Sequence, residues 1–513
     1  MGEEMVTNMP YLIPVISLVI AGYISFSNLI VHWEDFFTYV WWADYYVTLH
    51  DYPNWINGVF PLGYPLLLKT LFFISNDYLI AARIISLTGG VICLLFTYRI
   101  VLALFKDRRL AFLSQLFLFS SLFLQWFFLE GNDTLALSLQ LISVYYIMKE
   151  QQKNSDFIMA GVFVGLAYMV RYQSLVLVVI TFFWLLYTHK GKEGSSLKKA
   201  TVYLIFFFIA SFPHLYTSLS ATGNPFWMSQ GKNIWFGIYG DQNWVSNWQR
   251  VPYDISIFSV IMLSPLKFLL NWFRQFRHGL ELIQPMFPLN FFAIAGLLLS
   301  LFKEERGSRK NIVYTAIVIT GILVVTSVAF VLDRFLIFAY PFMIIFVLRF
   351  IDKIIPERCN LGRHFQIPMK LLFFIAALIY MAFITWLQYV PSYVHNPYFQ
   401  VNAAVTKVLN ENGMMKESEV FSSSTYFYNS LSPKKRRFST LVNYRTPENF
   451  LSIETFKNSI KSTGIKFVIF EERDGYPNYP GLRDLYDPSK APPSFHLIYR
   501  QETYPRMVIY KIS

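Results

Sequence analysis

Long apolar runs separated by short polar segments make up most of the sequence. A run of about 20 apolar residues is long enough to cross the hydrocarbon core of a bilayer as an α-helix. The pattern predicts about eleven transmembrane helices, near residues 10–31, 79–105, 110–128, 133–148, 157–170, 173–188, 200–219, 286–302, 311–332, 335–350 and 370–389. The first run is too long for a signal-peptide core and lacks a small-residue cleavage site, so we expect it to remain as an anchor.

The composition of the 513 residues agrees with a membrane protein. Hydrophobic residues make up 55% of the chain and charged residues 15%, whereas soluble domains are about a quarter charged. This excludes a disordered chain and a disulfide-rich secreted module, and it disfavours an ordinary cytosolic enzyme. Cys93 and Cys359 are far apart in the sequence, and no CxxC metal motif is present.

The net charge of +12 follows mainly from the position of the basic residues. Five short loops on one side of the predicted bundle hold 18 Lys and Arg residues, and the loops on the other side hold fewer despite their greater length. Because positively charged loops stay in the cytoplasm, the amino terminus is predicted to be cytoplasmic and the carboxyl terminus extracytoplasmic. The basic run at 434–437 is then expected to be solvated or to face lipid headgroups, and no nucleic-acid partner is predicted.

This topology predicts two domains. Residues 1–389 form the transmembrane domain, and residues 390–513 form a soluble extracytoplasmic domain. The second region is more polar and rich in turn residues. Its β-rich runs at 465–470, 495–499 and 507–510, together with helical stretches at 397–411 and 450–463, predict a small α/β domain.

Charged residues gather near the membrane face that is expected to be outer, and they are Glu34, Asp35, Arg83, Glu130, Asp133, Arg171, Asp333 and Arg334. Ionisable side chains at membrane depth are rare, and they usually line a cavity or pair with one another. Arginine binds phosphate oxygens in a bidentate manner, and a carboxylate can accept a proton from a hydroxyl group. Together they suit a phosphate-bearing lipid and a reaction that moves a proton.

Structural roles for the same residues remain open at this point. Glu34 and Asp35 are also compatible with an ordinary acidic pair at the membrane interface. Asp133 opens a predicted helix and is compatible with an N-cap. Asp333 and Arg334 are compatible with a simple ion pair.

The long outer segment 220–285 ends in an apolar but charged stretch from Phe258 to Leu282. This stretch predicts either an amphipathic surface helix or a re-entrant lid. Walker A, GxGxxG, HExxH and GxSxG motifs are absent from the sequence. A nucleotide-driven pump, a Rossmann enzyme and a zinc protease therefore lose their main support.

Several short motifs, in this order, resemble the GT-C glycosyltransferases, among which the protein O-mannosyltransferases and the lipid A aminoarabinose transferases are most similar. The motifs are Glu34-Asp35 with Tyr39 and Ala43, Pro61-Leu62-Gly63-Tyr64-Pro65, Ala82-Arg83-Ile84, Asp133-Thr134, Gly161 to Arg171, and Arg334-Phe335 followed by Pro341. The pattern covers most of residues 30–345. The resemblance implies a GT-C-like membrane domain followed by a soluble tail.

The resemblance also implies a function for these residues. It implies an inverting transfer of a sugar from a polyprenyl- or dolichyl-phosphate donor to a protein, lipid or glycan acceptor at the outer or luminal face. The first-loop acid is the family's catalytic base, which here is Asp35 or Glu34, with Asp35 favoured. Arg83, Arg171 and Arg334 become candidates for binding the donor phosphate.

Two features depart from the family pattern, and one requirement stays open. Many relatives have Asp-Glu or Asp-Asp where this chain has Glu34-Asp35, and Arg-Tyr where it has Arg334-Phe335. The sequence requires no cofactor. A divalent metal is compatible with the acids, and Glu130 and Asp133 are candidates for holding a metal or the acceptor.

Two other classes of function fit the composition. A transporter or flippase of lipid-linked or small solutes also carries charged residues in its spans. Such a protein would place them near the midplane and repeat its halves, whereas this chain places them at one face and has no internal repeat. A non-catalytic subunit that keeps a GT-C body is the other alternative.

Overall fold

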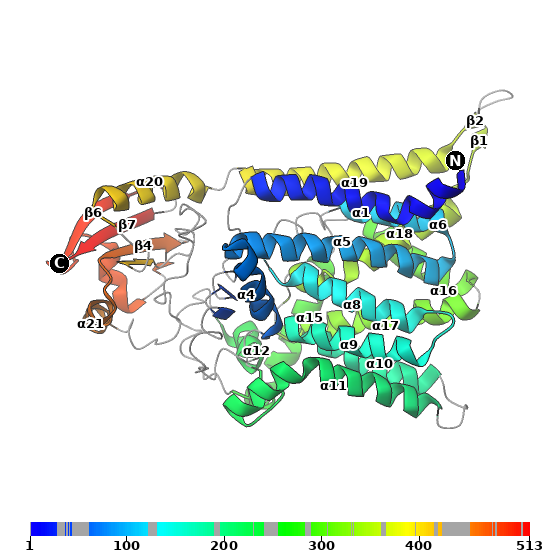
Figure 1. The fold of residues 1–513 in the computed structure, drawn as a ribbon, viewed down its shortest axis with the longest axis horizontal. Helices are drawn as coiled ribbons and strands as arrows, with labels where there is room; N and C mark the ends of the chain where they lie inside the picture. Colours follow the sequence, from blue (N-terminus) through cyan, green and yellow to red (C-terminus); the bar gives the residue numbers. More distant parts are fainter. Residues whose placement is uncertain are drawn as a thin grey trace.

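The computed structural model describes residues 2–27, 36, 39–40, 42–43, 61–121, 131–188, 195–228, 230–240, 255–282, 289–304, 306–329, 331, 333–360, 366–394, 397–414, 419–422, 452–473, 476–477, 480–503 and 506–513. Most of them form a bundle of helices that lie side by side, and a small sheet domain lies beyond one end of the bundle (Figure 1). The predicted polytopic helical architecture with a small C-terminal sheet domain is confirmed.

Each of the eleven predicted apolar runs coincides with a helix. These helices are α1 (Gly2–Ser27), α5 (Tyr78–Phe105), α6 (Arg108–Ser120), α8 (Asp133–Met148), α9 (Asn154–Val170), α10 (Ser174–Thr188), α11 (Ser195–Thr222), α16 (Leu289–Lys303), α17 (Arg306–Thr326), α18 (Ala339–Ile354) and α19 (Met369–Val394). Additional helices are α4 (Gly63–Ser75), α12 (Gln230–Tyr239), α14 (Ile257–Leu263) and α15 (Pro265–Leu282).

Some predicted boundaries were wrong. α17 ends at Thr326 rather than at residue 332, and the span predicted at 335–350 begins later, at Ala339. Between these two helices the chain forms a 3-10 turn, η2 (Asp333–Leu336), so Arg334 lies in a turn at the bundle end and not inside a span.

Helix length and composition agree with a membrane location. Four of the described helices are long and apolar enough to cross a bilayer by themselves, namely Tyr78–Phe105, Ser196–Thr222, Gly307–Thr326 and Met369–Leu387. Six shorter apolar helices accompany them. Large apolar side chains are exposed on the outer surface of the bundle, as expected where lipid takes the place of water.

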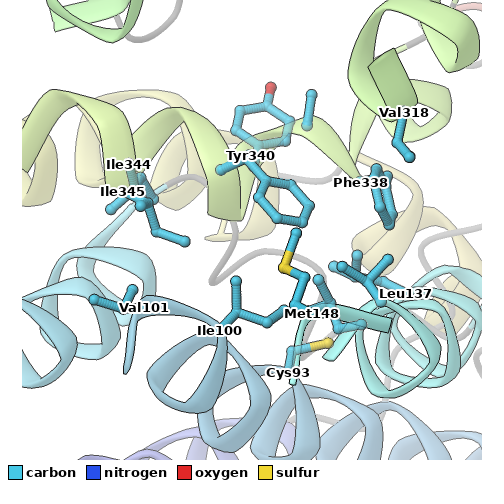
Figure 2. Packing of buried hydrophobic residues seen from close by; sticks show 14 of the residues in the cluster. Cys93, Ile100, Val101, Leu137, Met148, Val318, Phe338, Tyr340, Ile344 and Ile345 are labelled. Atoms are coloured by element: carbon cyan, nitrogen blue, oxygen red, sulfur yellow. The ribbon is translucent and has the colours of Figure 1, made fainter. Parts of the chain in front are cut away.

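The main hydrophobic core extends through most of the helical bundle. Figure 2 shows Cys93 and Ile100 of α5, Met148 of α8, Val318 of α17 and Ile345 of α18 packed in one cluster. Cys93 is a completely buried free cysteine. Because α18 is covered on nearly all sides, it forms the centre of this part of the bundle.

α9 and α11 pack closely because α9 has glycine at two positions four residues apart. A Cβ atom on Gly161 would collide with the carbonyl oxygen of Tyr203, and one on Gly165 would lie 2.7 Å from the carbonyl oxygen of Phe207. Small residues at this spacing let two membrane helices approach at backbone distance. The sequence motif from Gly161 to Arg171 thus contains the two glycines that pack against α11, and it ends at Arg171.

The two ends of the bundle differ in their charges. The end with the basic loops, called the basic end, is held by ion pairs. Arg349 of α18 bonds to Glu304 and lies 3.3 Å from Asp352, while Lys370 lies 2.9 Å from Glu357. The opposite end, at which α5 and α8 begin and α9 ends, carries Arg83, Asp133, Arg171 and Arg334, and it is called the site end.

The C-terminal domain contains a mixed sheet. Its strands are β3 (Val420–Ser422), β4 (Phe467–Arg473), β5 (Tyr476–Pro477), β6 (Phe495–Gln501) and β7 (Arg506–Ile512), in the order β3-β4-β7-β6 with β5 beside β4. β3 is parallel to β4, and the other pairs are antiparallel. The helices α20 (Pro397–Glu411) and α21 (Ile453–Thr463) flank the sheet (Figure 1). The three predicted β-rich runs correspond to β4, β6 and β7.

The close approach of α9 and α11 leads to a stability prediction. Gly161→Ala should lower the melting temperature, because the added methyl group must push the α11 backbone away, at a cost of about 1–3 kcal/mol. Gly307→Ala is the control, since a Cβ there meets nothing within 4 Å. Thermal unfolding of both variants in detergent is the measurement, and equal melting temperatures would contradict the packing argument.

Candidate functional site at one end of the helical bundle

Arg171 stands at the turn between α9 and α10. It caps the end of α9 with an extended backbone (φ −148°, ψ 126°), and its N–H donates to the carbonyl of Ala167 at 2.8 Å. Ser174 begins α10 three residues later, and its N–H donates to the carbonyl of Arg171 at 3.1 Å. This tight turn holds a nearly buried arginine side chain, 12% exposed, at the site end.

Asp133 is the partner of Arg171. The carboxylate of Asp133, at the first residue of α8, forms an ion pair with the Arg171 guanidinium. Asn132, and not Asp133, occupies the N-cap position, and the Asn132 side chain donates to the carbonyl of Val170 at 2.9 Å. Asp133 therefore pairs with Arg171 and does not occupy the N-cap position of α8, and its role in holding a metal or the acceptor stays a prediction.

Phe335 connects this ion pair to the η2 turn. Its ring centroid lies 5.3 Å from the guanidinium carbon of Arg171 and 5.4 Å from that of Arg334. Both distances are within the range of cation–π interactions. Two of the predicted site residues, Arg171 and Arg334, thus contact one aromatic ring, and Asp133 is joined to them through its ion pair with Arg171.

α15 holds the segment that leads into η2. The Asn271 side chain donates to the carbonyl of Ala329 at 3.2 Å, and the Trp272 indole donates to the carbonyl of Val324 at 3.0 Å. The side chain of Gln275 accepts the N–H of Val331 at 3.1 Å. Polar residues of α15 therefore satisfy backbone groups just before Arg334.

The other side of α15 is apolar and exposed. Phe258 of α14 and Leu266 and Phe273 of α15 are 70%, 69% and 67% exposed. The two helices bend by 107° at their junction. The predicted amphipathic stretch thus places Asn271, Trp272 and Gln275 on the protein, while large apolar side chains and the charged Lys267, Arg274 and Arg277 are exposed.

Arg83 reaches the site end from α5 and is completely buried. Its neighbours Ala82 and Ile85 belong to a second hydrophobic cluster, which also contains Phe36, Tyr39, Val40, Ala43, Tyr64, Ala136 and Val170, as well as Val405 and Ile469 of the C-terminal domain. Ala136 and Val170 are close in sequence to Asp133 and Arg171. The segment that follows Asp35 therefore packs among residues that neighbour three of the predicted charged residues.

The motif at 61–65 has a packing role at the same place. A Cβ atom on Gly63 would lie 2.7 Å from the carbonyl oxygen of Met169. Only glycine lets the start of α4 lie this close to the end of α9, two residues before Arg171. The ring of Tyr64 then packs edge-on against Tyr39 at 4.9 Å.

Glu34, Asp35 and Glu130 lie outside the described residues, and so do the side chain of Asp333 and the basic run at 434–437. Within the part of the chain that the structure describes, no group of three His, Cys, Asp or Glu residues could hold a metal ion. Asp133 is engaged by Arg171. The roles suggested for Glu34, Asp35 and Glu130, and the binding of a metal, therefore remain predictions.

Two buried polar residues near the site were missed by sequence reasoning. His214 of α11 is 1% exposed and packs against the rings of Tyr168 and Tyr172, where it supports the Arg171 turn. Lys232 of α12 is completely buried, and this burial lowers its pKa to about 7. Neither residue has a signal in the sequence, because both helices contain other polar residues and a sequence does not reveal burial.

The sequence matches one known family in part. Residues 60–216 match the family described as dolichyl-phosphate-mannose-protein mannosyltransferase. This region contains the motif at 61–65, Arg83, Asp133 and Arg171. A comparison with curated proteins finds no match.

Solved structures resemble nearly the whole chain. ArnT from Cupriavidus metallidurans bound to undecaprenyl phosphate has a TM-score of 0.58 at 11% identity, over 97% of this chain and 97% of that one. The archaeal oligosaccharyltransferase AglB from Archaeoglobus fulgidus, in complex with an inhibitory peptide and a dolichol-phosphate, has a TM-score of 0.51 at 12% identity, over 90% of this chain and 69% of that one.

The fold and the family match agree with each other. The chain has the fold of the GT-C membrane glycosyltransferases, and the resemblance found in the sequence motifs is confirmed. Residues 60–216 are similar to a family described by its use of dolichyl-phosphate-mannose, and two of the similar structures contain a lipid phosphate. At these sequence identities the structural likeness shows the fold and does not identify a donor or an acceptor.

The Asp133–Arg171 pair leads to a second prediction. Asp133→Ala should destabilise the protein by about 3–5 kcal/mol, because it leaves a nearly buried guanidinium without its carboxylate. Arg171→Ala should cost a similar amount, and the double variant should cost clearly less than the sum. Thermal unfolding of the four proteins measures the coupling, and strictly additive effects would argue against a direct pair.

A third prediction concerns pH. Lys232 has a lowered pKa in the folded protein, so between about pH 7 and the usual lysine value of 10.5 the unfolded chain binds more protons than the folded one. Stability should rise with pH across this window. Lys232→Met should flatten the rise, while Lys461→Met, at an exposed position of α21, should leave it unchanged. Melting temperatures from pH 7 to pH 10 test this, and an equal slope for all three proteins would contradict it.

Proposed function

We propose that the protein is an inverting glycosyltransferase. It transfers a sugar from a polyprenyl- or dolichyl-phosphate donor to an acceptor hydroxyl at the extracytoplasmic or luminal face. The observation that carries the proposal is the contact of Arg171 and Arg334 with Phe335 and the pairing of Arg171 with Asp133, at one end of a GT-C bundle.

The first chemical task is to hold the donor phosphate. A lipid phosphate is a ready leaving group, and negative charge grows on it as the bond to the sugar breaks. Guanidinium groups at this end of the bundle can bind its oxygens and stabilise that charge. Arg83 of α5 is completely buried, and its neighbours Ala82 and Ile85 belong to the second cluster. It is the third candidate for this role.

The second task is to remove a proton from the acceptor. Asp35 is the proposed base, and Glu34 is the alternative at the adjacent position. Asp35 directly precedes Phe36, which is 3% exposed and shares a cluster with Ala82, Ala136 and Val170. This connection supports a base close to the arginines. A carboxylate in the right place lets the hydroxyl attack the anomeric carbon while the lipid phosphate leaves on the opposite side.

The ligands of two similar proteins support a lipid phosphate donor. The similar ArnT structure contains undecaprenyl phosphate, and the similar AglB structure contains a dolichol-phosphate and a peptide. For this protein, a transfer assay has to identify the sugar and the acceptor. The proposal requires neither a nucleotide nor a metal-dependent step.

The test is sugar transfer by the purified protein in lipid nanodiscs. A panel of polyprenyl-phosphate sugars is supplied with protein, lipid and glycan acceptors, and glycosidic products are measured by mass spectrometry. Asp35→Asn should fold normally but lose about 10²- to 10⁴-fold in transfer rate. Glu34→Gln is the matched control at the neighbouring position and should retain most activity.

Two outcomes would count against this proposal. Full activity in both Asp35→Asn and Glu34→Gln would remove the first-loop acids from catalysis. Movement of a lipid-linked sugar across vesicles by the wild-type protein, with no glycosidic product from any acceptor, would favour the transporter alternative instead.

A further inference from the structure

The side chains of α15 fall into three sectors around the helix, because successive residues are about 100° apart. The first sector faces the protein and contains Asn271, Trp272, Gln275 and Gly279. The second sector is apolar and exposed and contains Leu266, Leu269, Leu270, Phe273 and Leu280. The third sector lies between these two and contains the charged or titratable side chains Lys267, Arg274, Arg277, His278 and Glu281.

α15 rests on the site end of α17 and does not run along its length. The Asn271 side chain donates to the carbonyl of Ala329. Gly279 is eight residues further along α15, about 12 Å away, and a Cβ there would still meet Leu323 and Val331. These partners all lie at or just after the end of α17, whereas two helices lying side by side would have partners that advance along both. α15 therefore lies at the end of the bundle that carries Arg171 and Arg334.

The charges of α15 disfavour a position inside the hydrocarbon core. By length and composition, α14 and α15 together could form a broken span that bends by 107°. Three Lys and Arg side chains along one such helix would be costly in hydrocarbon. At the membrane interface the same helix is favourable, because its apolar sector lies among acyl chains while the adjacent charged sector stays among the headgroups.

Glu281 is the single carboxylate in the sequence of α15, and it is paired within the helix. The Arg277 guanidinium donates to one of its oxygens at 2.8 Å, and His278 lies 3.6 Å from the other. The Arg277–Glu281 pair therefore contributes no net charge to the charged sector.

The other two cations of this sector contact neutral groups. Arg274 donates to the side chain of Asn271 at 2.6 Å and to the carbonyl of Gly237 at 3.4 Å. The Lys267 ammonium lies 5.8 Å from the centroid of the Tyr239 ring. Within the part of the chain that the structure describes, neither cation pairs with a carboxylate, and both side chains are exposed. The sector thus presents positive charge next to an apolar surface.

We propose that α14 and α15 form an interfacial anchor at the site end, in which Lys267 and Arg274 bind the headgroups of anionic phospholipids. Charge complementarity favours anionic over zwitterionic headgroups. Long basic side chains can reach the headgroups while their stems lie on apolar surface. The inference concerns the lipids around the bundle and does not depend on the proposed function. Because α15 binds backbone groups just before Arg334, its place in the leaflet also determines where the η2 turn lies.

The first experiment measures the depth of α15 in the membrane. Full-length protein with Cys359→Ser and Phe273→Cys is labelled with a fluorophore and placed in nanodiscs, and the remaining Cys93 is completely buried. Lipids carry a nitroxide quencher in the headgroup, near the top of the acyl chain or near its end. We expect the nitroxide near the top of the chain to quench most, because interfacial helices bury their apolar side by about 5–10 Å. Lys461→Cys, at an exposed position of α21, is the control and should be quenched little.

The second experiment compares quenching by nitroxide-labelled phosphatidylglycerol and phosphatidylcholine in the Phe273→Cys protein. Lys267→Gln with Arg274→Gln should lower the preference for phosphatidylglycerol by about five- to tenfold, since one cation near an anionic surface is worth about fivefold and salt weakens the effect. Arg277→Gln with Glu281→Gln is the matched control, because it removes an ion pair without changing the net charge, and it should stay within about twofold. If the first double variant does not fold, Lys267→Gln alone takes its place, with an expected loss of about threefold.

Four outcomes would contradict the proposal. Strongest quenching by the nitroxide at the chain end would place α15 deep in the bilayer, as a re-entrant lid. Little quenching by any lipid would show that a second copy or another protein covers the apolar sector. A wild-type protein without preference for phosphatidylglycerol, or an equal loss in the two double variants, would remove the headgroup role of Lys267 and Arg274.

Discussion

The charge of Arg171 inside an apolar helical bundle is the constraint on which the site end depends. A guanidinium there is costly unless a carboxylate and helix ends compensate for it. Asp133 supplies the carboxylate, and each of the two side chains lies at the helix end whose dipole favours its charge: the acid at the start of α8 and the base at the end of α9. Asn132 then ties the same two helix ends together through the carbonyl of Val170.

Close packing of backbones makes this pairing geometrically possible. Glycines let α9 approach α11, and Gly63 lets α4 lie on the last turn of α9. α15 holds the chain before η2 through three hydrogen bonds to backbone groups, so Arg334 comes to the ring that Arg171 also contacts. Residues without chemical roles thus determine where the arginines lie.

The two bundle ends use their charges differently. At the basic end Arg349 and Lys370 are matched by Glu304, Asp352 and Glu357, which is an arrangement that holds helices together. At the site end Asp133 pairs with Arg171, and Phe335 contacts both Arg171 and Arg334. This contrast supports the proposal that the site end, and not the basic end, binds the donor phosphate.

Local patterns in the sequence were sufficient for the helices, for the strands β4, β6 and β7, and for the placement of Arg83, Asp133, Arg171 and Arg334 at one end, because hydrophobic periodicity and span length act over neighbouring residues. The sequence could not decide whether Asp133 caps a helix or pairs with an arginine, nor which side of α15 faces the protein. It also could not show that Phe335 contacts Arg171, because these two residues lie far apart in the sequence. Such contacts arise only when distant helices pack, and there the tertiary structure decided the arrangement of the site.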